Sequence, residues 1–197
     1  MIVFIDRQHA GKWSKINDRG AGVDLDGDGK TTWEEQEATW TAYLSIMVEN
    51  NLLAMGFKVI PLSDGSYSER HERVNRYYNK LGPETAVYLA LHLNAGGGNY
   101  GSYFYDYRST QGKSLADHLC QGTSKYVPEV TNWKSVKANP NDWTKNAYYT
   151  IKGIGQPVAI CCEPIFMDTH KHLISIGGFS KIALGIAVGL REWEKEL

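Results

Sequence analysis

Three short apolar runs limit the folds open to this chain more than any other feature of its sequence. Residues Ile2–Ile5, Ala86–Leu93 and Pro157–Cys162 are almost continuously hydrophobic, which is typical of strands buried on both faces. Stretches with apolar residues at three- and four-residue spacing, typical of helices, lie between them. Strands that alternate with helices predict a single α/β domain, with a mixed, mostly parallel sheet and helices on both faces.

The same patterns place the remaining elements. A polar or glycine-rich stretch bounds each one, and Gly56 is a natural end for the first long helix. Residues 127–146 show no regular pattern, and we expect them to be irregular. Helices are expected at Trp33–Met55, Ser68–Leu81, Ser109–Tyr126 and Gly178–Glu194, and further strands at Phe57–Leu62 and Ser102–Tyr107.

Composition excludes several classes of partner. The formal net charge is −1 and no basic stripe stands out, so we expect no nucleic-acid partner. No apolar run reaches the roughly 18 residues of a transmembrane helix, so no membrane insertion is expected. Three cysteines, two of them adjacent, do not form a disulfide framework, and we expect buried, reduced thiols.

Residues able to bind a metal stand where three of the predicted strands end. His9 follows the first strand, His92 lies in the third, and Glu163 follows the last. In open α/β sheets, ligands collect at the carboxyl ends of strands, so these side chains can converge. Glu37 lies in the first turn of the long helix, which can sit over the same edge.

Two histidines and a carboxylate around an open position are a known arrangement for catalytic zinc. A further carboxylate beside the metal completes a hydrolase, because it can take a proton from the attacking water. Spacing alone does not establish such a site, since a given histidine is more often structural or exposed.

Local motifs strengthen this interpretation. They occur in a consistent order, and each stands at its expected place in the predicted fold. They are Asp6–Gly11, Glu37–Trp40, Gly56–Val59, Arg73–Arg76, His92–Gly96 and Val158–Asp168. On these motifs the chain resembles, over nearly its whole length, the zinc amidases of the Amidase_3 family found in phage endolysins and bacterial autolysins.

The resemblance implies a phosphorylase/hydrolase-like α/β fold and a zinc-dependent N-acetylmuramoyl-L-alanine amidase. Such an enzyme cuts peptidoglycan at the amide bond between N-acetylmuramic acid and L-alanine. It implies zinc on His9, Glu37 and His92, and Glu163 as general base. Asn94, within the His-x-Asn-Ala motif, is expected to help hold the substrate.

An acidic segment between His9 and Glu37 matches the twelve-residue loop of an EF-hand. Gly29 supplies the sharp turn at position 6. The segment belongs to an insertion at about residues 12–35, and no helix is evident before it, so we expect a calcium loop and not a paired EF-hand. The expected calcium ligands are Asp24, Asp26, Asp28, Lys30, Thr32 and Glu35.

Three glutamates stand near the start of the long helix. Glu37 is favoured as the zinc ligand over Glu34 and Glu35, because its distance to Gly56 fits the family helix. Glu35 occupies the last position of the calcium loop, two residues before Glu37. We therefore expect calcium to order the helix start and with it the zinc site.

Other polar residues have simpler interpretations. Asp168, His170 and His172 are expected to be solvated and not a second metal site. His71 and His118 lie in polar helical segments and are expected at the surface.

The resulting hypothesis is a monomeric phage endolysin whose partner is peptidoglycan, with residues 1–197 as its catalytic domain and no separate wall-binding domain. The segment Met1–Asp6 lacks the features of a signal peptide, so synthesis in the host cytoplasm and action on the wall after release are expected. Two alternatives stay open: a zinc peptidase acting on stem peptides, and a calcium-binding module without catalytic activity.

Overall fold

One six-stranded sheet forms the centre of the structure, a computed structural model that describes residues 1–9, 19–81 and 85–197. The strands lie in the order β2-β1-β3-β6-β4-β5. Neighbouring strands are parallel except β4 and β6, which are antiparallel. The strands are β1 (Ile2–Arg7), β2 (Lys58–Leu62), β3 (Ala86–Leu91), β4 (Gly101–Asp106), β5 (Trp133–Ala138) and β6 (Val158–Glu163). The mixed, mostly parallel sheet expected from the sequence is confirmed.

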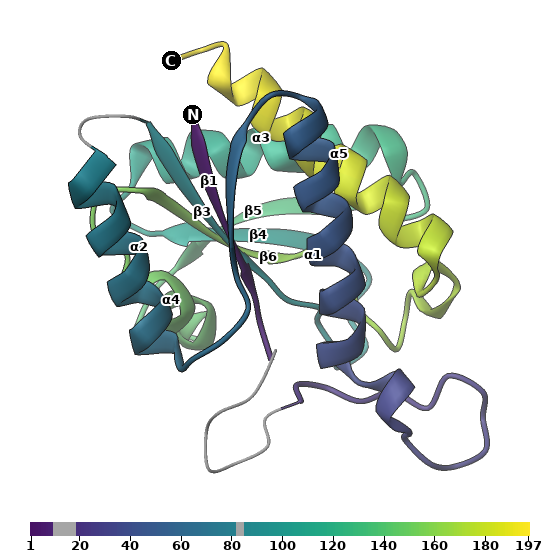
Figure 1. Cartoon of the computed structure of the whole chain (residues 1–197). Coiled ribbons are helices and arrows are strands. Elements are labelled where there is room, and N and C mark those ends of the chain that lie inside the picture. Colours follow the sequence, from purple (N-terminus) through teal and green to yellow (C-terminus); the bar gives the residue numbers. More distant parts are fainter. Residues whose placement is uncertain (10–18, 82–84) are drawn as a thin grey trace.

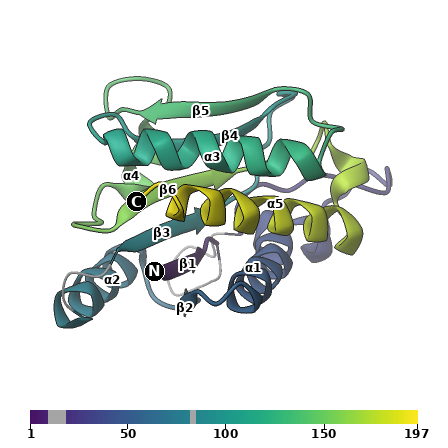
Figure 2. The same ribbon diagram turned by 90° about the horizontal axis from the view of Figure 1, so that it is seen from above.

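Helices cover both faces of this sheet, as Figures 1 and 2 show. In the described part of the chain, α1, α3 and α5 lie on one face, and α2 and α4 lie on the other. None of the helices described is both long and apolar enough to cross a membrane. They are α1 (Glu37–Ala54), α2 (Tyr67–Leu81), α3 (Thr110–Tyr126), α4 (Lys145–Ile151) and α5 (Ile176–Glu194), with 3-10 turns η1 (Trp33–Glu35) and η2 (Lys171–Leu173).

The central strands divide the apolar core into two layers. β3 is buried along its whole length, because alternate side chains point to opposite faces and helices cover both. Cys161 packs in the layer under α2 and α4, while Cys162 packs in the layer under α1, α3 and α5. Both thiols are free and buried, which confirms the sequence prediction for this pair.

The long helix expected at Trp33–Met55 is interrupted near its start. Gln36 has an extended backbone and pairs with Gly22, so the chain leaves helical geometry there and re-enters it at Glu37. The turn η1 before it is closed by Glu35, whose side chain accepts a hydrogen bond from the Thr32 backbone N–H. Glu37 is consequently the first residue of α1.

The expectation that residues 127–146 are irregular was wrong, because they contain β5 and the start of α4. β5 is an edge strand paired only with β4, and its sequence Trp-Lys-Ser-Val-Lys-Ala lacks an apolar run. Tertiary pairing decides its structure, and this is not visible in local composition. The short helix α4 was also not anticipated.

Helices α3 and α5 approach each other through glycines. A Cβ built on Gly122 would lie 2.4 Å from the Gly185 carbonyl oxygen, and one on Gly185 would lie 2.5 Å from the Thr123 Cα. A Cβ on Gly189 would lie 2.5 Å from the His118 carbonyl oxygen. All three contacts are with backbone atoms, which cannot move aside as a flexible side chain would. The helices therefore pack backbone against backbone.

We predict that Gly185→Ala lowers the free energy of unfolding by about 1–3 kcal/mol, because the added methyl group overpacks the α3–α5 contact. Denaturant unfolding would measure this. Gly177→Ala, in the first turn of α5, is the matched control, since a Cβ there meets no atom within 4 Å. It should leave stability unchanged or raise it by about 0.5–1 kcal/mol. Equal effects of both substitutions would contradict the packing argument.

Candidate functional site

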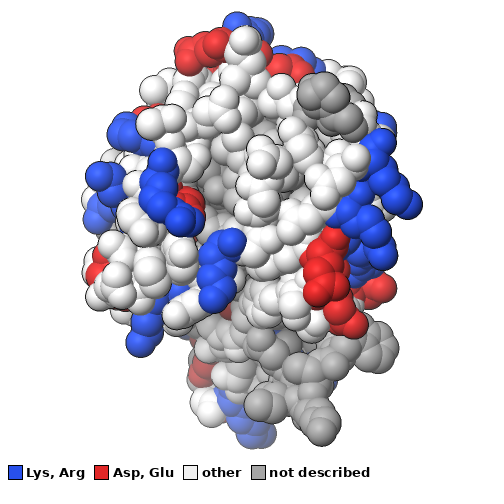
Figure 3. All heavy atoms as spheres, turned by 90° about the vertical axis from the view of Figure 1, so that its left-hand side faces the viewer, with Lys and Arg blue, Asp and Glu red and all other residues white. Residues whose placement is uncertain are grey.

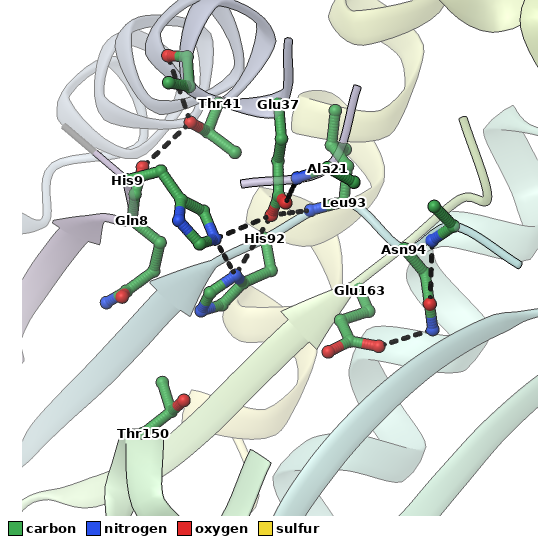
Figure 4. A network of polar contacts seen from close by, with 12 residues as sticks. Gln8, His9, Ala21, Glu37, Thr41, His92, Leu93, Asn94, Thr150 and Glu163 are labelled. Carbon is green, nitrogen blue, oxygen red and sulfur yellow. Dashed lines mark hydrogen bonds and ion pairs between the residues drawn. The ribbon is translucent and has the colours of Figure 1, made fainter. Parts of the chain in front are cut away.

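Backbone pairing of three neighbouring strands brings the predicted site residues together. The amide of Gln8, just after β1, donates to the Leu91 carbonyl at 3.4 Å, and the His92 amide donates to the Cys162 carbonyl at 2.8 Å. His9, His92 and Glu163 therefore stand at the same edge of the sheet, although distant in sequence (Figure 4). His9 has a φ of 55°, a left-handed conformation uncommon outside glycine.

Glu37 reaches the same edge from the start of α1. Its backbone N–H donates to the Ala21 carbonyl at 2.7 Å, and its Oε2 accepts from the Ala21 N–H at 3.0 Å. Its Oε1 accepts from the Leu93 N–H at 2.9 Å. Gly20 lies so close that a Cβ there would be 2.4 Å from Oε2, and its φ of +73° also favours glycine. The backbone around Glu37 thus fixes the carboxylate (Figure 4).

Three potential metal ligands face one another at this edge. The distances are 3.1 Å from His9 Nε2 to His92 Nδ1, 3.3 Å from His9 Nε2 to Glu37 Oε1, and 3.0 Å from His92 Nδ1 to Glu37 Oε1. Burial opposes charge on Glu37, which is only 4 % exposed, yet hydrogen bonds and attraction from both histidines hold its pKa well below the usual range. Two imidazoles and an ionised carboxylate this close together can bind a divalent metal.

Glu163 is a second carboxylate beside this group, and its pKa is shifted in the opposite direction to that of Glu37. Burial raises the pKa of Glu163 to about 7, and the nearby Glu37 carboxylate contributes in the same direction. Asn94 Nδ2 donates to Glu163 Oε2 at 2.6 Å, while Asn94 Oδ1 accepts from the Ala95 N–H at 2.8 Å. Asn94, expected to hold substrate, therefore orients the Glu163 carboxylate (Figure 4).

A buried ion pair beneath the site was not anticipated from the sequence. Asp6, at the end of β1, is fully buried, and its Oδ1 lies 2.8 Å from the Arg70 Nε. Its Oδ2 accepts from the Tyr88 hydroxyl. The pair ties α2 to the strand that leads into His9. The Asp6 motif was noted in the sequence, but nothing there indicated Arg70 as its partner.

The acidic loop has the backbone expected of a tight turn around converging carboxylates. The side-chain oxygens of Asp24, Asp26 and Asp28 lie within 4.8 Å of one another. Gly27 and Gly29 both have positive φ, and their amides donate to Asp24. The expected ligands Lys30 and Thr32 are exposed, and residues 12–18 of the expected insertion lie outside the described residues.

The Glu35 side chain forms hydrogen bonds near both ends of the acidic loop. Its Oε1 accepts from the Leu25 N–H, and Oε2 accepts from the Thr32 N–H and hydroxyl. Glu34 is exposed. Of the three glutamates near the helix start, Glu37 is therefore the one that faces the two histidines.

Asp168 and His170, both expected to be solvated, have structural partners. Asp168 Oδ2 accepts from the amides of Gly96 and Gly97, at 2.9 and 2.7 Å. The expectation was wrong for His170, which is buried: its Nδ1 accepts from the Phe166 N–H at 3.0 Å, so it supports the loop after Glu163. His172 is exposed.

The surface placement expected for His71 was wrong: this residue is buried, and its Nε2 lies 2.9 Å from the Thr150 carbonyl oxygen. It joins α2 to α4, a contact that the polar character of its own helix does not reveal. His118 is half-buried, and its Nε2 lies 3.1 Å from Glu196 Oε1.

An open cleft of about 650 Å³ lies over the metal-ligand group and Glu163. Its opposite wall comes from α4 and the start of α2. The cleft is lined by His9, Ala21, Glu37, Tyr67, His92, Leu93, Asn94, Ala95, Asn146, Ala147, Tyr149, Thr150 and Glu163.

Comparison of the sequence with protein-family models and with curated protein sequences gave no match. Solved structures do match. Cwp6 from Clostridium difficile aligns with a TM-score of 0.75 and 21 % sequence identity, over 97 % of this chain. The chain spans only 29 % of the length of Cwp6.

Two further structures match over nearly their whole length. The N-acetylmuramoyl-L-alanine amidase AmiC2 of Nostoc punctiforme has a TM-score of 0.74 and 18 % identity, covering 99 % of this chain and 97 % of its own. The catalytic domain of the CD27L endolysin, which targets Clostridium difficile, has a TM-score of 0.65 and 17 % identity, covering 98 % and 97 %. The chain therefore has the fold of these three structures, and the α/β fold expected from the sequence is confirmed.

We predict that His92→Ala and Glu37→Gln each reduce bound metal from about one equivalent per chain to below about a tenth, because each removes a ligand of a three-ligand site. Elemental analysis after dialysis against a divalent metal would measure this. His172→Ala is the matched control, since His172 is exposed in η2 and should leave the metal content unchanged. Full metal content in the Glu37→Gln and His92→Ala proteins would rule out this site.

Proposed function

We propose that the chain is a zinc-dependent N-acetylmuramoyl-L-alanine amidase that hydrolyses the bond between N-acetylmuramic acid and L-alanine in peptidoglycan. The observation that carries this proposal is the ligand group of His9, His92 and Glu37 with Glu163 beside it, at the base of an open cleft. The fold shared with amidases supports the substrate class.

Zinc fits this ligand group. A tetrahedral zinc ion with bonds of about 2.0–2.1 Å separates its ligand atoms by about 3.3 Å, close to the 3.0–3.3 Å observed here. Two imidazole nitrogens and one carboxylate oxygen are also a known catalytic donor set. When bound, zinc supplies Lewis-acid activation of water and of the scissile carbonyl.

Glu163 is the proton carrier of the reaction. A carboxylate with a pKa of about 7 takes a proton from water readily and also gives it up again near neutral pH. The water oxygen forms a bond to the carbonyl carbon, and its proton passes to Glu163. The carbon–nitrogen bond then breaks, and Glu163 returns the proton to the leaving amine of L-alanine.

The surrounding residues keep this carboxylate in position. Because Asn94 holds Oε2, Oε1 is the oxygen that exchanges the proton. Glu37, with a low pKa, stays ionised as a ligand throughout. The two carboxylates therefore divide the chemistry between metal binding and proton transfer.

We predict that purified peptidoglycan treated with the zinc-loaded protein releases new N-terminal L-alanine amines. Glu163→Gln should lower the rate at least about 100-fold, because the proton carrier is lost. Zinc chelation should abolish the reaction, and zinc should restore it. Activity should fall as the pH drops through the pKa of Glu163, because only the ionised carboxylate accepts a proton.

The product distinguishes this proposal from the alternatives. Release of a D-amino acid or of an internal stem-peptide amine, with no L-alanine terminus, would identify a zinc peptidase. No release from any type of wall, with zinc bound, would indicate a binding module. Glu72→Gln, an exposed glutamate on α2, is the control for the loss of a carboxylate and should keep full activity.

We further propose that the segment from Asp24 to Glu35 binds calcium and thereby orders the zinc site. The support is the register of oxygen ligands along twelve residues and the close approach of three aspartates. The Val23 N–H donates to the Glu35 carbonyl at 3.1 Å, so the ends of the loop are joined. Two residues further along each side, Ala21 and Glu37 are joined by two more hydrogen bonds. Order in the loop is thus transmitted to a zinc ligand.

We predict that removing calcium, or the double substitution Asp24→Asn and Asp26→Asn, weakens zinc binding by about 10- to 100-fold, as loss of outer-shell support does. Competition with a chromophoric zinc chelator, with and without millimolar calcium, would measure this. Glu72→Gln serves again as the control for the loss of an exposed carboxylate. Equal zinc affinity and activity in both conditions would refute the coupling.

We also propose that the enzyme acts as a monomeric phage endolysin. The endolysin catalytic domain that shares this fold supports the proposal. Synthesis in the host cytoplasm followed by release to the wall stays a prediction.

A further inference from the structure

The wall of the cleft that faces the metal-ligand group is formed by α4. Asn146, Ala147, Tyr149 and Thr150 of this helix line the cleft, and Thr150 lies across from His92 and Glu163 in Figure 4. The helix is anchored from below, because Ala147 and Ile151 are buried and His71 contacts the Thr150 carbonyl oxygen. Its inner side is thus attached to the core and to α2, and its outer side chains face the cleft.

Two of these side chains are available to a ligand. Tyr149 is 49 % exposed. Within the described residues, neither the Tyr149 hydroxyl nor the side-chain amide of Asn146 takes part in a hydrogen bond. The Lys152 Nζ lies 4.1 Å from the centroid of the Tyr149 ring, and the Tyr148 ring packs against it at 5.8 Å. The Tyr149 ring is thus held in place while much of its surface stays accessible.

Trp143 adds a second aromatic surface just before α4 begins. It is 69 % exposed, although its ring packs edge-on against the buried Phe104 at 6.0 Å. Trp143 lies two residues before α4 and outside the residues that line the cleft, so it can contact only a glycan that extends beyond the cleft.

The charge of the cleft indicates which part of the substrate this wall fits. None of the described residues that line the cleft is a lysine or arginine, and the Lys152 ammonium beside it is engaged by the Tyr149 ring. On the face that carries α2 and α4, Figure 3 shows charged side chains of both signs around a largely uncharged centre. A stem peptide carries carboxylates that require cations, whereas a sugar is matched by an aromatic face and an amide group.

We propose that α4 is the sugar-binding wall of the cleft. Tyr149 packs against the pyranose ring of the N-acetylmuramoyl residue at the scissile bond, and Asn146 hydrogen-bonds its hydroxyl or acetamido group. Trp143 binds the next sugar of the glycan strand. The stem peptide then lies in the part of the cleft away from α4, beside Ala21, Leu93 and Ala95. This inference rests on the proposed amidase function.

The test compares two substrates that differ only in the sugar: an N-acetylmuramoyl-L-alanyl peptide, and the same peptide carrying a lactoyl group alone. Tyr149→Ser and Asn146→Ala should each lower kcat/KM for the sugar-bearing substrate about three- to tenfold. For the lactoyl peptide, kcat/KM should stay within about twofold of the wild-type value. Tyr149→Phe should retain the preference, because the ring is kept.

A binding measurement covers the case in which the lactoyl peptide reacts too slowly to measure. Peptide-free glycan strands are titrated into the zinc-loaded Glu163→Gln protein, alone and combined with Trp143→Ala or Tyr149→Ser. Each combination should weaken binding about three- to tenfold. Tyr43→Ser is the matched control, because Tyr43 is 44 % exposed on α1, which covers the other face of the sheet.

The outcomes separate this inference from the amidase proposal. If the wild-type protein does not cut the N-acetylmuramoyl peptide, the amidase proposal fails, and glycan binding alone decides the role of α4. If it cuts this substrate and the substitutions affect both substrates equally, or leave glycan binding unchanged, the sugar-binding wall is refuted. A loss confined to peptide affinity would also refute it, since α4 would then hold the stem peptide.

Discussion

The parallel pairing of β1, β3 and β6 is the constraint on which the rest of the site depends. Because these strands run side by side in the same direction, the residues that follow them meet at one edge of the sheet. His9, His92 and Glu163 are brought together by backbone hydrogen bonds, with no requirement for contacts between their side chains. Glu37 alone arrives from another element, and the backbone of residues 20–22 and Leu93 holds it there.

The two glutamates of the site show how one cleft keeps similar groups in different charge states. Glu37 is buried and Glu163 is half-buried, and removal from water alone would favour the neutral acid in each. Two histidines and two backbone amides face Glu37 and keep it ionised, whereas Glu163 has one amide partner and a like charge nearby. The difference in partners therefore separates the candidate metal ligand from the proposed proton carrier.

Sequence reasoning reached the central strands and the ligand residues because both leave local patterns. Unbroken apolar runs mark β3 and β6, and histidines or a carboxylate stand where those strands end. It failed where structure depends on distant partners. β5 is a strand because β4 pairs with it, His71 is buried because α4 covers it, and Arg70 is an ion-pair partner because Asp6 lies beneath it. Asn94 lies in the cleft, but its contact with Glu163 became evident only from geometry. The opposite wall of the cleft, on α4, lies more than 130 residues after His9 and has no spacing that relates the two.

The glycine contacts between α3 and α5 give the molecule two mechanically different sides. Where helices meet backbone to backbone, no side-chain rotamers separate them, so the layer that holds α1, α3 and α5 deforms little. Among the residues that the structure describes, the opposite layer has two helices, and α4 has fewer than two full turns. Any adjustment to the shape of a bulky polymer is therefore expected to occur in the α2–α4 layer. Glu37 is attached to the stiff side through α1, and the wall across the cleft from it belongs to the layer that deforms more easily.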